Sequence, residues 1–234
     1  MLSNPYQWLA ATLFLIPGFL IAIPAHELGH ALAAYWMGDR TPRNRGYLSL
    51  YEPRKFFSLY GLLMMLFWRV GWGERIPVNE YRLEGLREKL AYDLAGPAAN
   101  LLLAVVFGLA TRPLIAYVIP TTVVLPPVGF IANIVYGAYF ANLSIMAFNL
   151  LPIPGFDGWR VVEDIFRRRK PRFFVDVAMR QQQIQQVLII GLFIAQFFAG
   201  NLLNVAMVPF YAPAATLILG VCTGYPTNSL PCLP

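Results

Sequence analysis

The sequence predicts an all-α polytopic membrane protein, and three observations support this prediction. Apolar residues make up 58% of the 234-residue chain, whereas charged residues make up only 13%. The apolar residues form runs longer than the roughly 20 residues that a membrane-crossing helix needs, and the charges gather in a few clusters between these runs. A soluble protein of this length could not bury so much apolar surface. The net charge of +6 therefore does not indicate nucleic-acid binding.

The apolar runs predict membrane spans at 8–37, 90–111, 127–151 and 184–208, and a further apolar piece covers 213–222. The C-terminal membrane region, residues 184–234, therefore has one span, or two if Gly200 and Asn201 divide it. The uncharged run at 56–68 is shorter, with thirteen residues. That length favours a re-entrant or interfacial segment over a full crossing.

Basic residues predict the orientation of the spans, because Lys and Arg are enriched in cytoplasmic loops. All of the eighteen except Arg112 lie in three clusters, at 38–55, 69–89 and 159–180. These clusters can share the cytoplasmic side only if the 56–68 segment dips into the membrane and returns on the same side.

Two other segments have recognisable patterns. Residues 46–51 and 75–79 show alternation and β-branched content, which predicts a small membrane-associated β element within a re-entrant or β region at about 44–80. Residues 159–183 form a basic segment on the cytoplasmic side, in which apolar residues among the arginines favour an interfacial amphipathic helix. A plain cytoplasmic loop would explain the same charges.

The first span contains His26-Glu27-Leu28-Gly29-His30, an H-E-x-x-H pattern. Positions i and i+4 share one face of a helix, so both imidazoles can reach one Zn²⁺ while Glu27 stands beside it. Ionisable residues inside a span are energetically costly and indicate function by default. The alternative is that these three side chains only pair with neighbouring helices.

A catalytic zinc site needs a third protein ligand, and the sequence has only two histidines. Cys222 and Cys232 are expected near the opposite membrane face, either paired with each other or as isolated thiols. A carboxylate is the natural candidate, and Asp93 and Asp157 are the two acids besides Glu27 that adjoin spans. Asp157 follows prolines and a glycine that must break the helix, and irregular backbone at membrane depth is tolerated only when it is buried or lines a cavity. Asp157 is therefore the predicted third ligand, whereas Asp93 is expected to face the interface.

Several motifs together resemble the site-2 protease family of intramembrane zinc metalloproteases, in its compact bacterial and archaeal form without extra soluble domains. The H-E-x-x-H helix is the first of them. Ala95-Gly96-Pro97-Ala98-Ala99-Asn100 is similar to a G-P-x-x-N element, residues 149–158 to N-x-x-P-x-P-x-x-D-G, and residues 71–79 to G-W-x-x-P-V-P-V-N. The matching order covers about residues 10–160, although Tyr51-Glu52-Pro53 stands where Asn-Pro is usual.

The resemblance implies a three-helix catalytic core within residues 1–158, with one Zn²⁺ per chain bound by His26, His30 and Asp157. It implies that Glu27 is the catalytic base, that Asn149 holds the substrate backbone or the developing oxyanion, and that the β element clamps the substrate by strand addition. The substrate would be a single-span or other membrane protein, cut in or near a transmembrane segment in regulated intramembrane proteolysis. The implied location is the plasma membrane of a prokaryote, with the active site toward the cytoplasm.

Two other functions compete with proteolysis. A catalytically inactive relative could bind membrane helices as a chaperone or scaffold, but the intact ligands and base argue against it. A metal transporter would need a polar path across the bilayer, and the outer halves of the spans offer no acid or histidine. Asn100, which ends the G-P-x-x-N element, either links helices or takes part in catalysis, and Asn133 and Asn142 are expected only to link helices.

Overall fold

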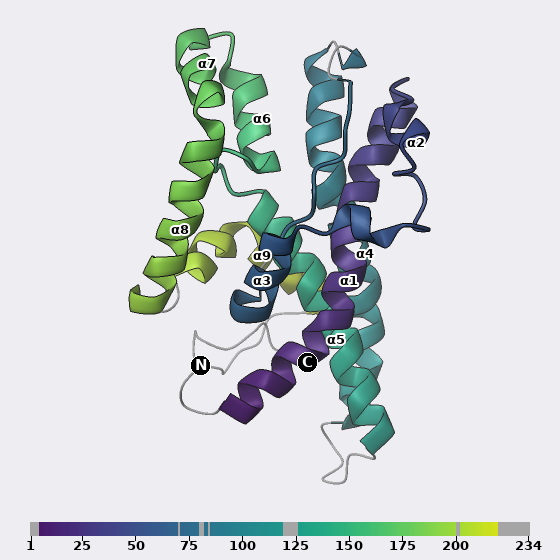
Figure 1. The fold of residues 1–234 in the computed structure, drawn as a ribbon. Coiled ribbons are helices and arrows are strands. Elements are labelled where there is room, and N and C mark those ends of the chain that lie inside the picture. Colours follow the sequence, from purple (N-terminus) through teal and green to yellow (C-terminus); the bar gives the residue numbers. More distant parts are fainter. Residues whose placement is uncertain are drawn as a thin grey trace.

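The computed structural model describes residues 5–69, 71–79, 82–83, 85–118, 126–199 and 202–219. Within these ranges the chain is mostly helical, and no strand is present, so the all-α prediction is confirmed for the described part. The elements in Figure 1 are α1 (Pro5–Trp36), α2 (Thr41–Asn44), the 3-10 helix η1 (Pro53–Phe56), α3 (Leu59–Trp68), α4 (Leu86–Val118), α5 (Pro126–Asn149), α6 (Asp157–Phe166), α7 (Pro171–Met179), α8 (Gln181–Ala199) and α9 (Leu202–Leu219).

Four helical stretches in the described residues are long and apolar enough to cross a membrane. They are Thr12–Trp36 in α1, Leu86–Leu114 in α4, Gly129–Asn149 in α5 and Leu202–Leu219 in α9. The first three coincide with predicted spans. In the region of the predicted fourth span, 184–208, α8 ends at Ala199 and the candidate span is Leu202–Leu219 in α9, an arrangement that fits the alternative in which Gly200 and Asn201 divide the region. The sequence has Gly200 and Asn201 there, two poor helix formers, and α8 begins with five glutamines in six residues. Cys222 and Cys232 lie outside the described residues.

Helices α1, α4 and α5 pack closely against one another. A Cβ atom on Gly18 of α1 would lie 2.6 Å from the carbonyl oxygen of Gly137 in α5, and a Cβ on Gly29 would lie 2.6 Å from the carbonyl oxygen of Ala95 in α4. Glycine therefore lets the backbones touch, as small residues do in membrane helix bundles. This close approach brings the face of α1 that carries the histidines directly against α4.

Helix α3 and its flanks form a loop whose two ends meet. Phe57 and Gly73 form an isolated antiparallel bridge, and the Glu74 N–H donates to the Phe56 carbonyl at 3.0 Å. At the far end of α3, Ser144 of α5 donates to the Arg69 carbonyl at 3.0 Å. With ten residues, α3 is too short to cross a bilayer. The meeting ends are the geometry that a re-entrant segment requires, although its insertion in the membrane remains a prediction.

The predicted β element is not confirmed. Residues 46–51 form turns, and residues 75–79 are without regular secondary structure. Tyr47 packs, together with Phe56 and Phe57, on the cluster around Phe19 and Ile23 of α1, whereas Leu50 and Tyr51 are exposed. The alternation of residue types at 46–51 is therefore not matched by alternating burial, since residues 46–48 are half-buried and residues 49–51 are exposed.

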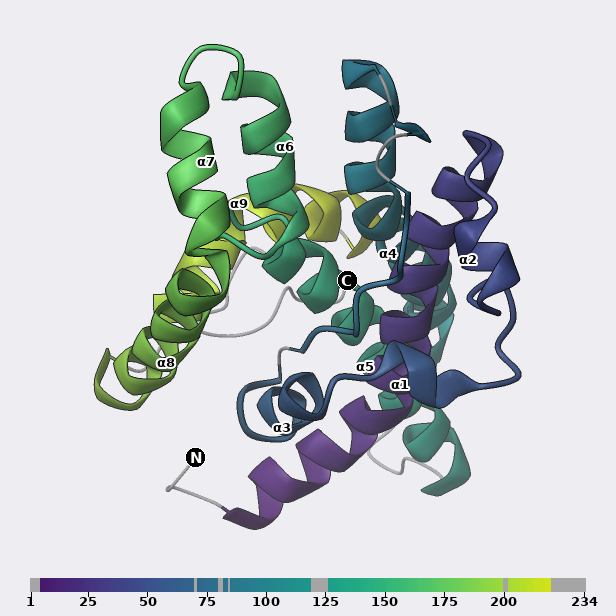
Figure 2. The ribbon, with the colours of Figure 1, turned by 45° about the horizontal axis from the view of Figure 1, so that its top comes forward.

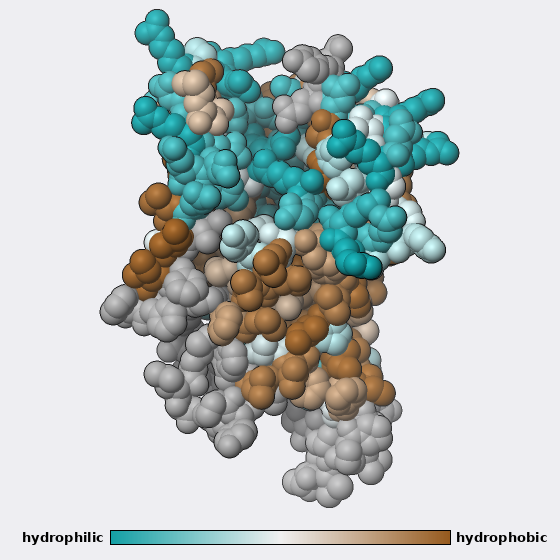
Figure 3. All heavy atoms as spheres, in the orientation of Figure 1, coloured by the Kyte–Doolittle hydropathy of each residue, from teal (hydrophilic) through white to brown (hydrophobic). Residues whose placement is uncertain are grey.

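The basic segment after α5 folds as two helices, α6 and α7, which stand side by side in both views (Figures 1 and 2). The single amphipathic helix predicted here is interrupted before Pro171, because proline lacks an N–H and disfavours helical backbone at the residue before it. Figure 3 shows hydrophilic side chains gathered over α2, α6 and α7, and hydrophobic side chains over the opposite half. This division agrees with the predicted grouping of the basic clusters at one end.

Candidate metal centre

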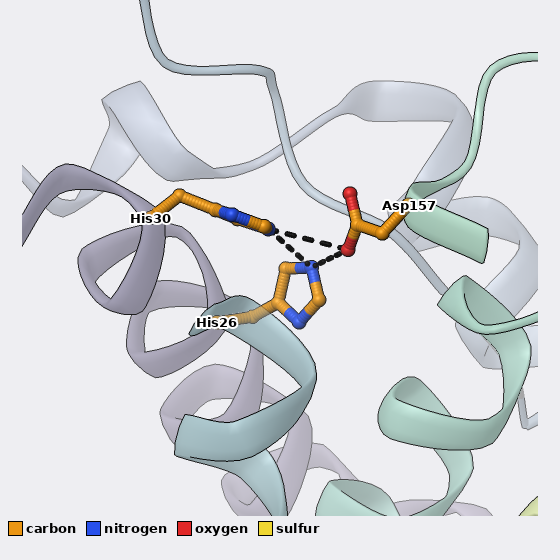
Figure 4. Close-up of side chains that lie close together, drawn as sticks. All are labelled: His26, His30 and Asp157. Carbon is orange, nitrogen blue, oxygen red and sulfur yellow. Dashed lines mark hydrogen bonds and ion pairs between the residues drawn. The ribbon is translucent and has the colours of Figure 1, made fainter. Parts of the chain in front are cut away.

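The predicted ligands His26, His30 and Asp157 converge on one point (Figure 4). Asp157 Oδ2 lies 3.0 Å from His26 Nε2 and 3.2 Å from His30 Nε2, and the two nitrogens are 3.3 Å apart. Both histidines are buried, and they project from adjacent turns of α1, while Asp157 is the first residue of α6. The structure therefore joins side chains that are 127 positions apart in the sequence.

The orientation of His26 is set by an asparagine on α4. His26 Nδ1 lies 2.7 Å from Asn100 Oδ1, and the Asn100 amide nitrogen donates to the Ala22 carbonyl at 2.9 Å and to Asn142 Oδ1 at 3.0 Å. Because the amide nitrogen has two acceptors, the Asn100 oxygen is left facing the imidazole, and His26 Nδ1 must carry the hydrogen. Asn100 and Asn142 do link helices, as expected, and Asn100 also fixes the tautomer of a metal-site histidine.

A backbone carbonyl sets the orientation of His30. His30 Nδ1 lies 2.7 Å from the carbonyl oxygen of Tyr92 in α4, and a carbonyl can only accept. When the rings are neutral, as metal-ligating imidazoles are, both Nε2 atoms carry a lone pair, and both face the carboxylate of Asp157. Three acceptor atoms that meet without a proton between them repel one another unless a cation lies between them. A metal ion is the usual cation, and metal-ligating histidines usually donate their other N–H to an oxygen, as both histidines do here. The donor set of two imidazoles and one carboxylate suits zinc.

Gly96, in the G-P-x-x-N element, leaves room for both imidazoles. A Cβ atom there would collide with His30 Nε2 and would lie 2.8 Å from His26 Cε1. Any larger side chain would occupy the space in which the rings stand. The site therefore requires glycine at position 96. From the sequence alone, only the resemblance to the G-P-x-x-N element singled out this glycine.

Glu27 lies next to this cluster, between α1 and the segment after α3. Its side chain is buried, and a Cβ atom on Gly73 would be 2.7 Å from Glu27 Oε1. The carboxylate therefore faces the backbone of residues 71–79. Arg75 of this segment donates to the carbonyl of Gly155, in the turn that leads to Asp157. The segment thus connects the neighbourhood of the base to the loop that carries the third ligand.

The structure also places two other residues that the sequence analysis considered, Asp93 and Asn149, and Asp93 differs from its predicted surroundings. Asp93 was expected to face the interface, but it is buried, and its Oδ1 accepts from Arg160 Nε at 2.8 Å. The Asp93 carboxylate is engaged there and does not join the cluster, which is why Asp157 is the better third ligand. Asn149 is buried at the end of α5, and its amide donates to the Ile145 carbonyl of its own helix at 3.0 Å. Its role toward substrate stays a prediction.

Curated relatives place the chain in a family. Rip2 of Mycobacterium tuberculosis is 32% identical over 203 residues, which cover 84% of this chain and 73% of the relative. YwhC of Bacillus subtilis is 31% identical over 172 residues, which cover 68% of this chain and 72% of the relative. Both carry the description "Putative zinc metalloprotease". No protein-family model matches the chain, and no solved structure matches it. The chain belongs to the site-2 protease family of zinc metalloproteases.

Proposed function

We propose that the chain is an intramembrane zinc metalloendopeptidase that hydrolyses a peptide bond in or near a transmembrane segment of a membrane protein. The observation that carries the proposal is the convergence of His26, His30 and Asp157, with their acceptor atoms 3.0–3.3 Å apart, beside the buried Glu27. The two histidines and Glu27 lie within a helical stretch that is long and apolar enough to span a membrane.

The proposed mechanism assigns a task to each residue. His26, His30 and Asp157 hold one Zn²⁺ per chain, and zinc, when bound, supplies Lewis-acid activation of water and of the scissile carbonyl. Glu27 takes a proton from the attacking water and passes it to the leaving amine. Asn100 and the Tyr92 carbonyl keep the imidazoles in the tautomer that presents a lone pair at Nε2.

Substrate handling follows from the position of residues 71–79. A helical substrate hides its carbonyls in its own hydrogen bonds, so it must unwind locally before cleavage. Residues 75–78 form no regular structure and lie in the segment that passes the base, so they are placed to pair with an unwound substrate backbone as an added strand. Asn149 would then hold the substrate carbonyl or the oxyanion. We also propose that the active site faces the cytoplasm of a prokaryotic plasma membrane, because the basic clusters are expected on that side; Figure 3 shows hydrophilic side chains gathered at one end of the molecule.

The test compares the purified wild type with Glu27→Gln on a labelled single-span model substrate in proteoliposomes. Both proteins should bind one zinc, and the variant should lose about 10²- to 10⁴-fold in cleavage rate, because only the base is removed. Glu74→Gln is a matched control, since Glu74 is exposed and one residue beyond Gly73, and it should cleave at the wild-type rate. Cleavage that survives Glu27→Gln or removal of zinc would overturn the mechanism. Bound zinc without any turnover of the wild type would favour the scaffold function instead.

A further inference from the structure

Helices α4 and α6 are joined by two ion pairs; in one pair the acid is on α4 and the base on α6, and in the other pair the acid is on α6 and the base on α4. Asp93 Oδ1 of α4 accepts from Arg160 Nε of α6 at 2.8 Å, and Lys89 Nζ of α4 lies 4.0 Å from Asp164 Oδ1 of α6. We call these the inner pair and the outer pair. Their members are four residues apart on each helix, so they occupy successive turns of an antiparallel contact.

The two pairs differ in burial. The side chain of Asp93 is 1% exposed and that of Arg160 is 23% exposed, whereas Lys89 is 40% exposed. The second oxygen of Asp93 is buried and accepts no hydrogen bond from a donor among the described residues, and the Asp164 carboxyl group is a close neighbour of Asp93. A carboxylate in this environment depends on its ion-pair partner, because leaving a buried charge without its partner is strongly unfavourable. The outer pair is longer, and its lysine is more exposed than either member of the inner pair, although Asp164 is 16% exposed.

The inner pair is next to the metal centre on both helices. Arg160 is three residues after Asp157, on the first turn of α6, and Asp93 follows Tyr92, whose carbonyl accepts from His30. The Arg160 guanidinium also lies 5.1 Å from the centre of the Tyr92 ring, and that ring is 5.1 Å from the His30 ring. One cation thus contacts the residue that orients His30 and belongs to the helix that carries Asp157.

We propose that Arg160 is a positioning residue of the metal centre, and that its ion pair with Asp93 holds α6 on α4 so that Asp157 meets His26 and His30. Helix α6 begins after an irregular turn, residues 150–156, against which Gly158 packs closely, and the ion pair with α4 acts together with this turn to set how α6 is rotated. The two histidines are on α1 and are oriented from α4. The register between α4 and α6 therefore decides whether the carboxylate reaches the imidazoles.

This inference rests on the proposed zinc site, and its test reads metal binding and not catalysis. Zinc affinity of the full chain in detergent is measured by competition with a chelator, and the visible spectrum of the Co²⁺-loaded protein reports the geometry of the ligands. Arg160→Met should weaken zinc binding about tenfold to a hundredfold, as removal of groups that support metal ligands does, and should alter the Co²⁺ spectrum. Arg160→Lys should recover part of the affinity. Lys89→Met, in the outer pair, should match the wild type within about twofold, because Lys89 is exposed and its contact with Asp164 is long.

A double variant separates positioning from stability. Asp93→Leu with Arg160→Met removes both charges, so the melting temperature should return toward the wild-type value, while zinc binding stays weak because apolar contact does not set the register. If Arg160→Met alone fails to fold, the zinc affinity of this double variant tests the inference instead. The inference is overturned if zinc affinity returns together with the melting temperature, or if Arg160→Met binds zinc like the wild type. Absence of zinc from the wild type would instead refute the proposed function.

Discussion

The contacts of α1 and α6 with α4 and the contacts of α9 with α5 are both buried, but different interactions hold them. At α4 the contacts include His26 to Asn100, His30 to the Tyr92 carbonyl, and Asp93 to Arg160. At α5 they are apolar, between Leu143 or Met146 and the α9 residues around Ile218 and Leu219.

The difference shows where geometry is specified. A buried polar atom must find its partner at one distance and angle, so the polar contacts fix the rotation and register of the helices. Apolar side chains tolerate changes of shape if the volume is kept. Chemistry that needs three atoms on one point is therefore expected at the polar contacts, and the apolar contacts are expected to contribute stability alone. Four substitutions test this comparison.

Gly96→Ala should have the largest effect. The added methyl group would collide with His30 Nε2 and crowd His26 Cε1, so at least one imidazole must leave its position. We expect zinc affinity to fall by about a hundredfold or more, the upper end of the range for changes around ligands, as measured by chelator competition. Gly191→Ala in α8 is the control, because nothing lies within 4 Å of a Cβ there. Equal zinc affinities in the two variants would contradict the account.

Asn100→Leu removes the acceptor that fixes the His26 tautomer. We expect zinc affinity to fall about tenfold to a hundredfold. The matched change is Asn133→Leu in α5, since the Asn133 amide donates to the Gly129 carbonyl of its own helix and the side chain is exposed. If Asn133→Leu weakened zinc binding as much, the effect would come from loss of any amide in a span and not from the tautomer.

Met207→Ala tests the apolar side of the comparison. Met207 of α9 is buried in a cluster with Phe148 and Leu151 at the end of α5. Truncation should cost about 2 kcal/mol of stability through lost packing and a cavity, measured as a lower melting temperature in detergent. Zinc affinity should stay within about twofold of the wild type. A loss of zinc affinity as large as that of Asn100→Leu would show that the two regions are not independent.

Asp39→Asn should have the smallest effect. Burial opposes ionisation of this carboxyl, but hydrogen bonds from Thr41 and from the Asn79 N–H outweigh it and hold the pKa of Asp39 below its ordinary value. A lowered pKa means that the stabilisation is present above the unfolded-state pKa of about 3.9 and is lost as the pH falls through the lower folded-state value.

The variant should lose about 1 kcal/mol near neutral pH, the contribution of one hydrogen bond. The gap in melting temperature between wild type and variant should narrow as the pH is lowered toward about 3. A gap that widens on acidification would mean that the sign of the pKa shift is wrong.

The sequence predicted the parts of the site that depend on local pattern. The H-E-x-x-H spacing places His26 and His30 on one face of any helix that contains both. The prolines and glycines after Asn149 break the helix, so that α5 ends there and Asp157 begins a new helix, α6. Long apolar runs likewise predicted three of the four candidate spans. In each case a short stretch of chain carries enough physical constraint to decide its own structure.

Other features could not be predicted, because their cause lies elsewhere in the fold. The Tyr92 carbonyl that orients His30 has no side-chain signature, since every residue has such a carbonyl. The burial of Asp93 depends on Arg160, 67 positions away. The alternation at 46–51 fitted a strand, but these residues form turns, in which Tyr47 packs on the α1 cluster and Leu50 and Tyr51 are exposed.

X-ray absorption at the zinc edge of the metal-loaded full chain tests the central claim most directly. The account predicts two imidazole nitrogens at about 2.0–2.1 Å and oxygen donors at about 2.0–2.2 Å, with the imidazole signal reduced in His26→Ala and oxygen coordination changed in Asp157→Ala. Sulfur at about 2.3 Å, or a spectrum that Asp157→Ala leaves unchanged, would contradict it.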